Sequence, residues 1–254
     1  MLLHEELLNL RLFYLADHLD EFLLKIKKNA FDPRKMLQHL VELELAERQN
    51  RSTQNRLKSA KIGRAKLLAE FDWAWPKEID RSAIDELMTT EFVKSNQNAV
   101  IAGPQGVGKT MIAKNIALSA IAGGFHVLFT SASDLVIDLG AQESTAALQR
   151  RLRRYIGPDL LVIDELGYLS FDHRAADLLF EIISKRYENG STIVTTNLAF
   201  KDWGVPFQGA ASVTPLIDRL THNCEVIKID ADSYRVKESS QRKIGKKNAK
   251  PTAH

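Results

Sequence analysis

The residues best suited to chemistry form a short run at positions 103–110, which reads Gly-Pro-Gln-Gly-Val-Gly-Lys-Thr. The run matches the pattern G-x-x-x-x-G-K-[ST] in full, and it lies between an apolar stretch and an expected helix. Glycines allow successive backbone N–H groups to turn toward phosphate oxygens, and the start of a helix adds its dipole. The run therefore predicts a site for the phosphates of a nucleotide.

Two residues of this run have expected roles of their own. We expect Lys109 to reach the β- and γ-phosphates of ATP and Thr110 to ligate Mg²⁺ through its hydroxyl. A glycine turn that matches by chance is the alternative, and the strand and helix expected on either side argue against it. The expected nucleotide contacts in the run and just after it are Gly103, Pro104, Gln105, Gly106, Val107, Gly108, Lys109, Thr110 and Met111.

A pair of acids follows a second apolar stretch, because residues 160–165 read Leu-Leu-Val-Ile-Asp-Glu. Ligands of open α/β sheets bind at the carboxyl ends of the strands, which is where these acids would lie. We expect Asp164 to hold the Mg²⁺ shell and Glu165 to orient and polarise the attacking water. Alone, a strand that ends in Asp-Glu is weak evidence, since many such pairs lie in surface turns; its place after the glycine run strengthens it.

A third polar group ends the stretch at residues 192–197, which reads Thr-Ile-Val-Thr-Thr-Asn. Asn197 could hydrogen-bond both the γ-phosphate and the catalytic water. Its alternative role is to cap a turn through its side chain. The guanosine signature Asn-Lys-x-Asp occurs nowhere in the chain, which favours ATP over GTP.

Positive charge is concentrated in residues 48–66, in residues 150–154 and in the tail from residue 233. These stretches hold 18 of the 35 basic residues and 1 of the 32 acidic ones. Segregated positive charge favours a polyanionic partner, because neutralised phosphates release counterions. We therefore expect salt-sensitive binding of duplex DNA with little sequence preference. The candidate contacts are Arg48, Arg51, Lys58, Lys61, Arg64, Arg150, Arg151, Arg153 and Arg154.

Several of these cations would share a helix face, since 48/51, 58/61 and 61/64 are three residues apart. The alternative is an ordinary solvated charged face, which is the usual meaning of a charge run. Residues 48–66 contain no acid, and this absence favours a binding surface.

The elements that would position these groups differ along the chain. An apolar stripe at Leu8, Leu12, Leu15, Leu19, Phe22 and Ile26 is typical of a helix. Asp32 and Pro33 predict the start of a second helix, as N-cap and first helical residue. From about residue 98, apolar strands (99–102, 125–130, 159–163, 192–196 and 226–229) alternate with helices.

This alternation predicts an α/β fold with a parallel sheet flanked by helices, preceded by a small all-α N-terminal domain. We expect a helical domain over residues 1–70, a linker with entry helices over 71–97, an ATPase domain over 98–237 and a basic disordered tail over 238–254. Trp73 and Trp75 in the linker could pack against adenine, although packing between the domains is the simpler expectation.

Composition narrows the class of protein. The chain of 254 residues has 44% hydrophobic and 26% charged residues, as ordinary globular proteins do. Cys224 is the single cysteine, so an intramolecular disulfide is excluded. No apolar stretch approaches the length of a membrane span, and the first residues do not resemble a signal peptide. We expect a cytoplasmic protein without membrane contact.

The combination of motifs resembles the AAA+ ATPases, and more closely the IstB-like transposition helper ATPases, which are relatives of the DnaC-type helicase loaders. The resemblance runs from about residue 8 to residue 238. Beside the nucleotide motifs it rests on Leu10-Arg11-Leu12, the basic stretch, residues 71–75, Ile79-Asp80-Arg81, Asp218-Arg219-Leu220 and Ser233-Tyr234-Arg235.

The resemblance implies an accessory ATPase of an insertion sequence. Such a protein would bind duplex DNA, form a homo-oligomer on it with ATP, and recruit and stimulate a transposase. Arg219 matches the arginine finger, which would reach the γ-phosphate in a neighbouring subunit. An arginine that only reaches solvent is the alternative. Arg235 resembles the sensor II arginine of the same subunit, although no separate helical lid follows the last strand.

Three other functions remain open. A loader of a replicative helicase would share the same motifs. A small-molecule kinase would use the same glycine run, but Glu165 and Asn197 argue for hydrolysis. A binding module would hold nucleotide as a switch without turnover. Steady-state phosphate release, with and without duplex DNA, separates the last two functions from the first two.

Overall fold

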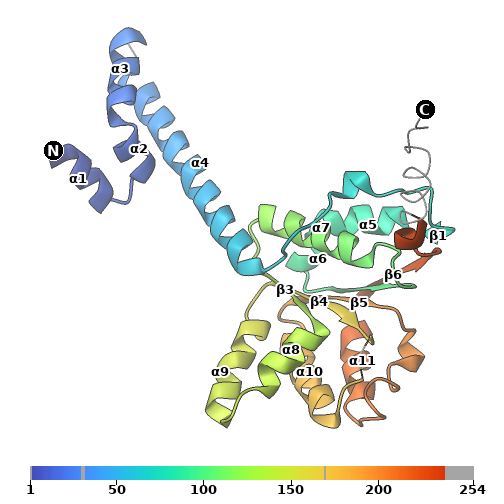
Figure 1. Ribbon diagram of the computed structural model, residues 1–254. Helices are drawn as coiled ribbons and strands as arrows, with labels where there is room; N and C mark the ends of the chain where they lie inside the picture. The colour runs from blue at the N-terminus through green and yellow to red at the C-terminus, as the bar shows by residue number, and fades with distance from the viewer. Residues whose placement is uncertain (1, 30–31, 169, 238–254) are drawn as a thin grey trace, which may run out of the picture. The chain divides into compact units, whose positions relative to one another are not determined.

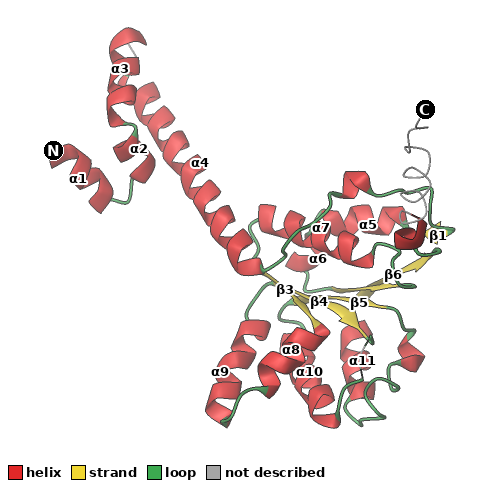
Figure 2. Cartoon of the chain, viewed as in Figure 1, coloured by secondary structure: helices red, strands yellow, loops and turns green. Residues whose placement is uncertain are grey.

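The computed structural model describes residues 2–29, 32–168 and 170–237 (Figures 1 and 2). Its contacts divide the chain into two compact units, Met1–Asn55 and Arg56–His254, and each is described by itself. The division falls inside one long helix, whereas the sequence placed the end of the N-terminal domain at residue 70. The boundaries at 70 and 97 stay predictions, and the tail of residues 238–254 lies outside the described residues.

The first unit is helical. Its core is formed by Leu7, Leu15, Ala16 and Phe22, so the predicted apolar stripe is buried in part; the side chain of Ile26 lies outside the described residues. The fourth helix begins at Pro33, and Asp32 accepts hydrogen bonds at its first turn, as predicted. The helices are α1 (Leu2–Asn9), α2 (Phe13–Asp17), α3 (Leu19–Asn29) and α4 (Pro33–Ala60).

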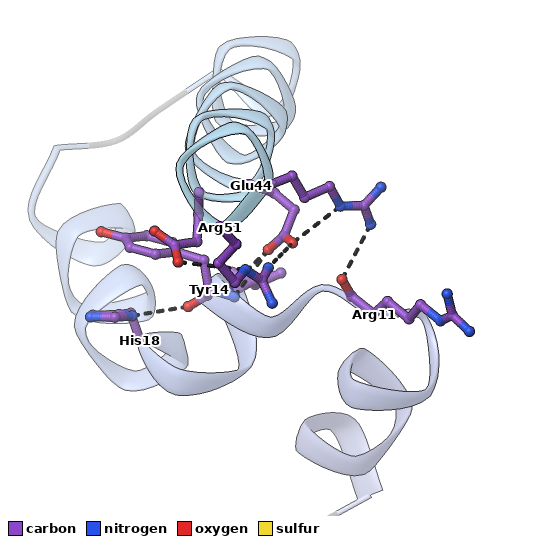
Figure 3. A network of polar contacts seen from close by, with 8 residues as sticks. Arg11, Tyr14, His18, Glu44 and Arg51 are labelled. Atoms are coloured by element: carbon purple, nitrogen blue, oxygen red, sulfur yellow. Dashed lines mark hydrogen bonds and ion pairs between the residues drawn. The ribbon is translucent and has the colours of Figure 1, made fainter. Parts of the chain in front are cut away.

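A buried glutamate of α4 holds the start of α2 in place. Glu44 is 3% exposed, and its Oε2 accepts hydrogen bonds from the backbone N–H groups of Tyr14 (3.1 Å) and Leu15 (3.5 Å). These groups belong to the first turn of α2, whose own N-cap residue makes no side-chain bond. Figure 3 shows how the Glu44 carboxylate lies between this turn and the guanidinium of Arg51.

The second unit contains a six-stranded sheet in the order β1-β6-β2-β5-β4-β3. Strand β1 pairs antiparallel with β6, and all other neighbours are parallel, which confirms the predicted fold class. The short β1 was not predicted, and the other strands differ from their expected bounds by a few residues. The strands are β1 (Glu78–Ile79), β2 (Asn98–Ala102), β3 (Val127–Ser131), β4 (Leu160–Leu166), β5 (Ser191–Thr196) and β6 (Cys224–Asp230).

Helices cover both faces of this sheet (Figure 1). One core contains Ile112 and Ile116, from the helix that follows β2. The other contains Leu135, Leu152 and Leu179. The first face carries α5 (Arg81–Met88), α6 (Glu91–Lys94) and α7 (Lys109–Ala122); the second carries α8 (Ala132–Gly140), α9 (Thr145–Ile156), α10 (His173–Arg186) and α11 (Val213–Thr221).

Arg186, at the end of α10, joins several elements on the second face. Only 1% of its surface is exposed, and burial lowers its pKa to about 10. Its guanidinium donates to the carbonyls of Tyr155, Ile156 and Pro158, and so satisfies the end of α9. It also donates to the carbonyl of Ser191 and the hydroxyl of Thr192, at the start of β5.

Among the described residues, none of the helices combines the length and the apolar character needed to cross a membrane.

Candidate nucleotide-binding site

The glycine run forms a tight loop between β2 and α7. Gly106 and Gly108 have φ values of +81° and +103°, a region that side chains rarely adopt. A Cβ atom on Gly103 would lie 2.5 Å from the carbonyl oxygen of Ile229, and one on Gly108 would lie 2.6 Å from the Phe71 ring. The loop therefore requires glycine at these positions, and α7 begins at the lysine that follows them.

Lys109 folds its ammonium group back over the loop. Nζ donates to the carbonyl oxygens of Gly103 and Pro104, both at 2.7 Å, and to the hydroxyl of Tyr168 at 3.2 Å. Burial lowers the pKa of Lys109 to about 8, and the negative charge of Asp164 opposes this shift. The lysine is thus a cation placed directly beside the loop.

The two strand-end acids lie beside the same loop. The Thr110 hydroxyl donates to Asp164 Oδ1 over 3.0 Å, and Asp164 is 6% exposed. Hydroxyl and carboxylate oxygens are hard ligands, so this pair fits one edge of a Mg²⁺ shell completed by water and phosphate oxygens. No group of three or more His, Cys, Asp or Glu side chains with metal-site geometry occurs in the described part of the chain. Glu165, by contrast, is exposed.

A cavity of about 420 Å³ opens beside these groups. Thr110, Glu165 and Tyr168 line it together with the loop. Its remaining lining includes three aromatic residues, Phe71, Trp75 and Tyr234, and the cations Arg64, Lys66, Lys114 and Arg235. Aromatic faces beside a phosphate-binding loop suit a purine base, and the cations suit its phosphates.

Two segments from outside the loop form the walls of the cavity. Asn115 of α7 accepts from Leu68 N and donates to the carbonyl of Lys66, which fixes the segment before Phe71. The C-terminal segment meets the loop where Tyr234 N donates to the carbonyl of Gly106 over 3.1 Å. Arg235 is thereby brought to the cavity, and its contact with a nucleotide stays a prediction.

The two tryptophans of the linker differ in position. Trp75 lines the cavity, and its indole Nε1 donates to the carbonyl of Asp232 over 2.8 Å. Trp73 instead packs against the Phe71 ring, with the Arg81 guanidinium over its own ring. Of the two, Trp75 is therefore the candidate for contact with a base.

Two predicted catalytic residues lie away from the cavity. Asn197 follows β5, is exposed and is not part of the cavity lining. Arg219 lies on α11, where it donates to the Ser184 hydroxyl over 3.0 Å. It lines a different cavity together with Asn98, at the start of β2, whereas the glycine loop follows the end of β2. Arg219 therefore lies at the amino ends of the parallel strands, whereas the glycine loop lies at their carboxyl ends.

The first group of predicted DNA contacts is only partly helical. Helix α4 ends at Ala60, and Lys61 has a φ of +58°, so the expectation that 58/61 and 61/64 share a helix face is wrong. The buried side chain of Ile62 packs into the core of the second unit, and this burial takes the chain out of the helix. Lys58, Lys61 and Arg64 are exposed.

Other predicted DNA contacts are engaged in ion pairs. Arg48 and Arg51 both lie 3.4 Å from Glu44, one helical turn or more before them. Arg151 binds Asp138 through two nitrogens, and its hydrogen bond holds the pKa of that carboxyl below its usual value. Arg154 lies 3.6 Å from the same carboxylate. Arg150 and Arg153 are exposed.

Sequence reasoning did not single out several residues of the site. Phe71, Tyr168 and Thr195 contact the loop, the lysine or the acids, and Asn115 holds the segment before Phe71. Thr195 had a signal in the sequence as a polar residue near the end of an otherwise apolar strand, and Phe71 had one as part of residues 71–75, on which the family resemblance rested.

The chain matches the family described as IstB-like ATP binding protein over residues 5–242. It is 36% identical over 199 residues to the protein named as the ATP-binding protein of insertion sequence IS5376 from Geobacillus stearothermophilus. The aligned residues cover 78% of this chain and 79% of the relative. It is 33% identical to the protein so named for insertion sequence IS21 from Pseudomonas aeruginosa, over 95% of this chain and 91% of that one.

Solved structures share part of the fold at lower identity. The chain in the crystal structure of DnaI has 20% sequence identity to this chain and a TM-score of 0.54. The match covers 68% of this chain and 92% of the DnaI chain. The replication initiator DnaA, bound to AMPPCP and single-stranded DNA, is 19% identical, covers 68% of this chain and 56% of its own, and has a TM-score of 0.53. These likenesses concern the fold alone. Because the family match extends over nearly its whole length, the chain belongs to the family of IstB-like ATP-binding proteins.

Proposed function

We propose that the protein is a Mg²⁺-dependent ATPase that serves an insertion-sequence transposase. The contact between the Thr110 hydroxyl and Asp164 Oδ1, 3.0 Å apart, carries the proposal. It brings the start of α7 and the end of β4 together at one edge of the sheet, as a phosphate loop and its metal-binding acid require. The relatives named for insertion sequences support the biological setting.

Different residues of the ATP site would bind the phosphates, the Mg²⁺ ion and the base. Residues 103–110 would surround the β- and γ-phosphates, and the Lys109 ammonium would exchange its loop carbonyls for phosphate oxygens. Thr110 and Asp164 would hold Mg²⁺, which when bound neutralises charge on the phosphate oxygens. Arg235 would contact a phosphate from the C-terminal segment, and Trp75 would lie against the base.

Hydrolysis needs a base and a group that stabilises the transferred phosphoryl. Glu165 is exposed to the cavity and would take a proton from water as the water oxygen attacks the γ-phosphorus. The bond to the β-phosphate oxygen then breaks and ADP leaves. Asn197 follows β5, the strand next to β4, and would orient the water once it turns toward the cavity.

Arg219 would act on the nucleotide of a neighbouring copy. It lies at the amino ends of the strands, and the glycine loop lies at their carboxyl ends, so Arg219 cannot reach the triphosphate bound by its own chain. An arginine at the amino ends can serve a head-to-tail assembly, in which each copy presents Arg219 to the next site. We therefore propose an ATP-dependent homo-oligomer.

Duplex DNA is the proposed surface for this assembly. The exposed cations Lys58, Lys61 and Arg64 supply phosphate contacts without base recognition, and Arg150 and Arg153 form a second exposed group. Arg48, Arg51, Arg151 and Arg154 share their charge with acids of the protein, and we give them a smaller part in DNA binding.

The decisive experiment measures phosphate release by the purified chain with ATP and Mg²⁺, with and without duplex DNA, together with negative-stain imaging. The proposal expects DNA-stimulated hydrolysis and rings or filaments that need ATP. Persistent monomers without turnover would overturn it. Coprecipitation with an insertion-sequence transposase, compared with a replicative helicase, separates a transposition helper from a helicase loader.

A further inference from the structure

A buried threonine connects the two strand-end acids to each other. Thr195 lies on β5 and has no exposed surface. Its hydroxyl oxygen accepts a hydrogen bond from Glu165 N over 3.0 Å, and its hydroxyl group contacts Asp164 Oδ1 in a short hydrogen bond. One side chain thus contacts both of the acids on which the proposed hydrolysis depends.

The geometry of β4 explains why a side chain is needed there. Ile163 pairs with Val194 and Leu166 pairs with Thr196, so two residues of β4 lie opposite the single residue Thr195. This bulge interrupts the ladder of backbone hydrogen bonds and redirects side chains. The Glu165 N–H, which has lost a backbone partner on β5, donates to the threonine hydroxyl instead.

The bulge also places Glu165 in an unusual backbone conformation. Its φ is +62°, a left-handed value that is uncommon for residues other than glycine. Such conformations persist only when the surroundings hold them, and they occur often at functional sites. The hydrogen bond from Glu165 N to Thr195 is one of the contacts that hold this residue.

The direction of each hydrogen bond follows from the donors available. A threonine hydroxyl has one hydrogen. Because the Glu165 N–H donates to Thr195 Oγ1, the single hydroxyl hydrogen is left for the Asp164 carboxylate. The Thr110 hydroxyl donates to the same carboxylate oxygen, so Asp164 Oδ1 is held by two hydroxyl groups from different elements.

We propose that Thr195 is a positioning residue for hydrolysis. It fixes the Asp164 carboxylate as an acceptor for Thr110 and holds the backbone that presents Glu165 to the cavity. This proposal rests on the ATPase function proposed above. Thr195 lines the nucleotide cavity, and its hydroxyl bonds to Glu165 N and to Asp164. Its hydroxyl therefore matters for turnover and for the use of Mg²⁺ more than for nucleotide affinity.

The test compares Thr195→Val, which keeps the shape and removes the hydroxyl, with Thr195→Ser, which keeps the hydroxyl. We expect Thr195→Val to lower kcat about 10- to 100-fold, since misplaced reacting groups cost that much. The Mg²⁺ concentration that gives half-maximal turnover should rise, while the Kd for a fluorescent ATP analogue should change little. Thr195→Ser should restore most of the rate and of the Mg²⁺ response.

Thr192→Val is the matched control on the same strand. The Thr192 side chain is buried and accepts a hydrogen bond from Arg186, away from the acids. This variant should lose thermal stability and keep the kcat of the parent. If Thr195→Val does not fold, Thr195→Ala takes its place in the comparison with serine.

The outcomes separate the two proposals. A parent protein that hydrolyses ATP, with a Thr195→Val variant of equal kcat and equal Mg²⁺ response, overturns the role of Thr195 and leaves the ATPase intact. Equal losses in the valine and serine variants would mean that the threonine is only a packing residue, and would also overturn it. A parent that releases no phosphate under assembly conditions would overturn both.

Discussion

The Thr110 hydroxyl lies 3.0 Å from Asp164 Oδ1, which joins the first turn of α7 to the end of β4. These two residues are far apart in the chain and meet because β2 and β4 both end at the same edge of a parallel sheet. Everything proposed about chemistry depends on this meeting of a helix start and a strand end.

Replacement of Glu165 by Gln separates binding from turnover. The amide keeps the size of the side chain but cannot take a proton, so phosphate release should fall about 100-fold or more. ATP binding should remain, because Glu165 does not contact the glycine loop in the proposed site. Phosphate release and binding of a fluorescent ATP analogue check the two effects separately. Unchanged turnover would remove Glu165 from its role as base.

Replacement of Arg219 by Ala tests action between subunits. The variant should bind ATP and lose hydrolysis, since its own site is intact but its neighbour lacks the arginine. Mixing it with Glu165→Gln protein should restore part of the activity, because some interfaces then combine an intact Arg219 with an intact Glu165. Phosphate release by the mixture, compared with each variant alone, is the measurement. A mixture that stays inactive would count against the assembly proposed here.

Replacement of Arg186 by Met tests whether this buried side chain stabilises the second unit. The change leaves several buried carbonyls near the end of α9 and the start of β5 without a donor. We expect a loss of about 3 kcal/mol in the free energy of unfolding of the second unit. Its Tm should then fall by about 6–12 °C. Lys185→Met, at an exposed neighbour paired with Glu181, is the control and should leave Tm nearly unchanged.

Replacement of Lys58 and Lys61 together by Ala tests the DNA surface. Both residues are exposed, and neither lines the nucleotide cavity. Affinity for duplex DNA should fall for all sequences alike, and the slope of log K against log salt should decrease by about 2. A double variant of Lys77 and Lys94, exposed cations outside the three basic stretches, is the matched control. Equal affinity and slope in both double variants would exclude Lys58 and Lys61 as contacts.

Local patterns in the sequence predicted much of this protein. The glycine run, the acids at residues 164 and 165 and the alternation of strands and helices all depend on neighbours in the chain, and the fold class they predict is confirmed. Asp32 and Pro33 likewise marked the start of α4.

Contacts between distant segments could not be predicted in this way. No local pattern shows that Glu44 accepts from the first turn of α2, or that it shares its charge with Arg48 and Arg51. Counting acids only within residues 48–66 therefore made those arginines look unpaired. Similarly, the role of Thr195 depends on a bulge in the neighbouring strand, which the sequence of β5 does not contain.

Lys109→Ala is the sharpest test of the glycine loop as a nucleotide site. The variant removes the cation that lies beside the loop, while Lys77→Ala at an exposed site controls for loss of charge. Binding of an ATP analogue and phosphate release should be measured on parent, variant and control. We predict that Lys109→Ala loses hydrolysis and most of its nucleotide affinity, while the control resembles the parent. A Lys109→Ala protein that binds and hydrolyses ATP as the parent does would contradict the account.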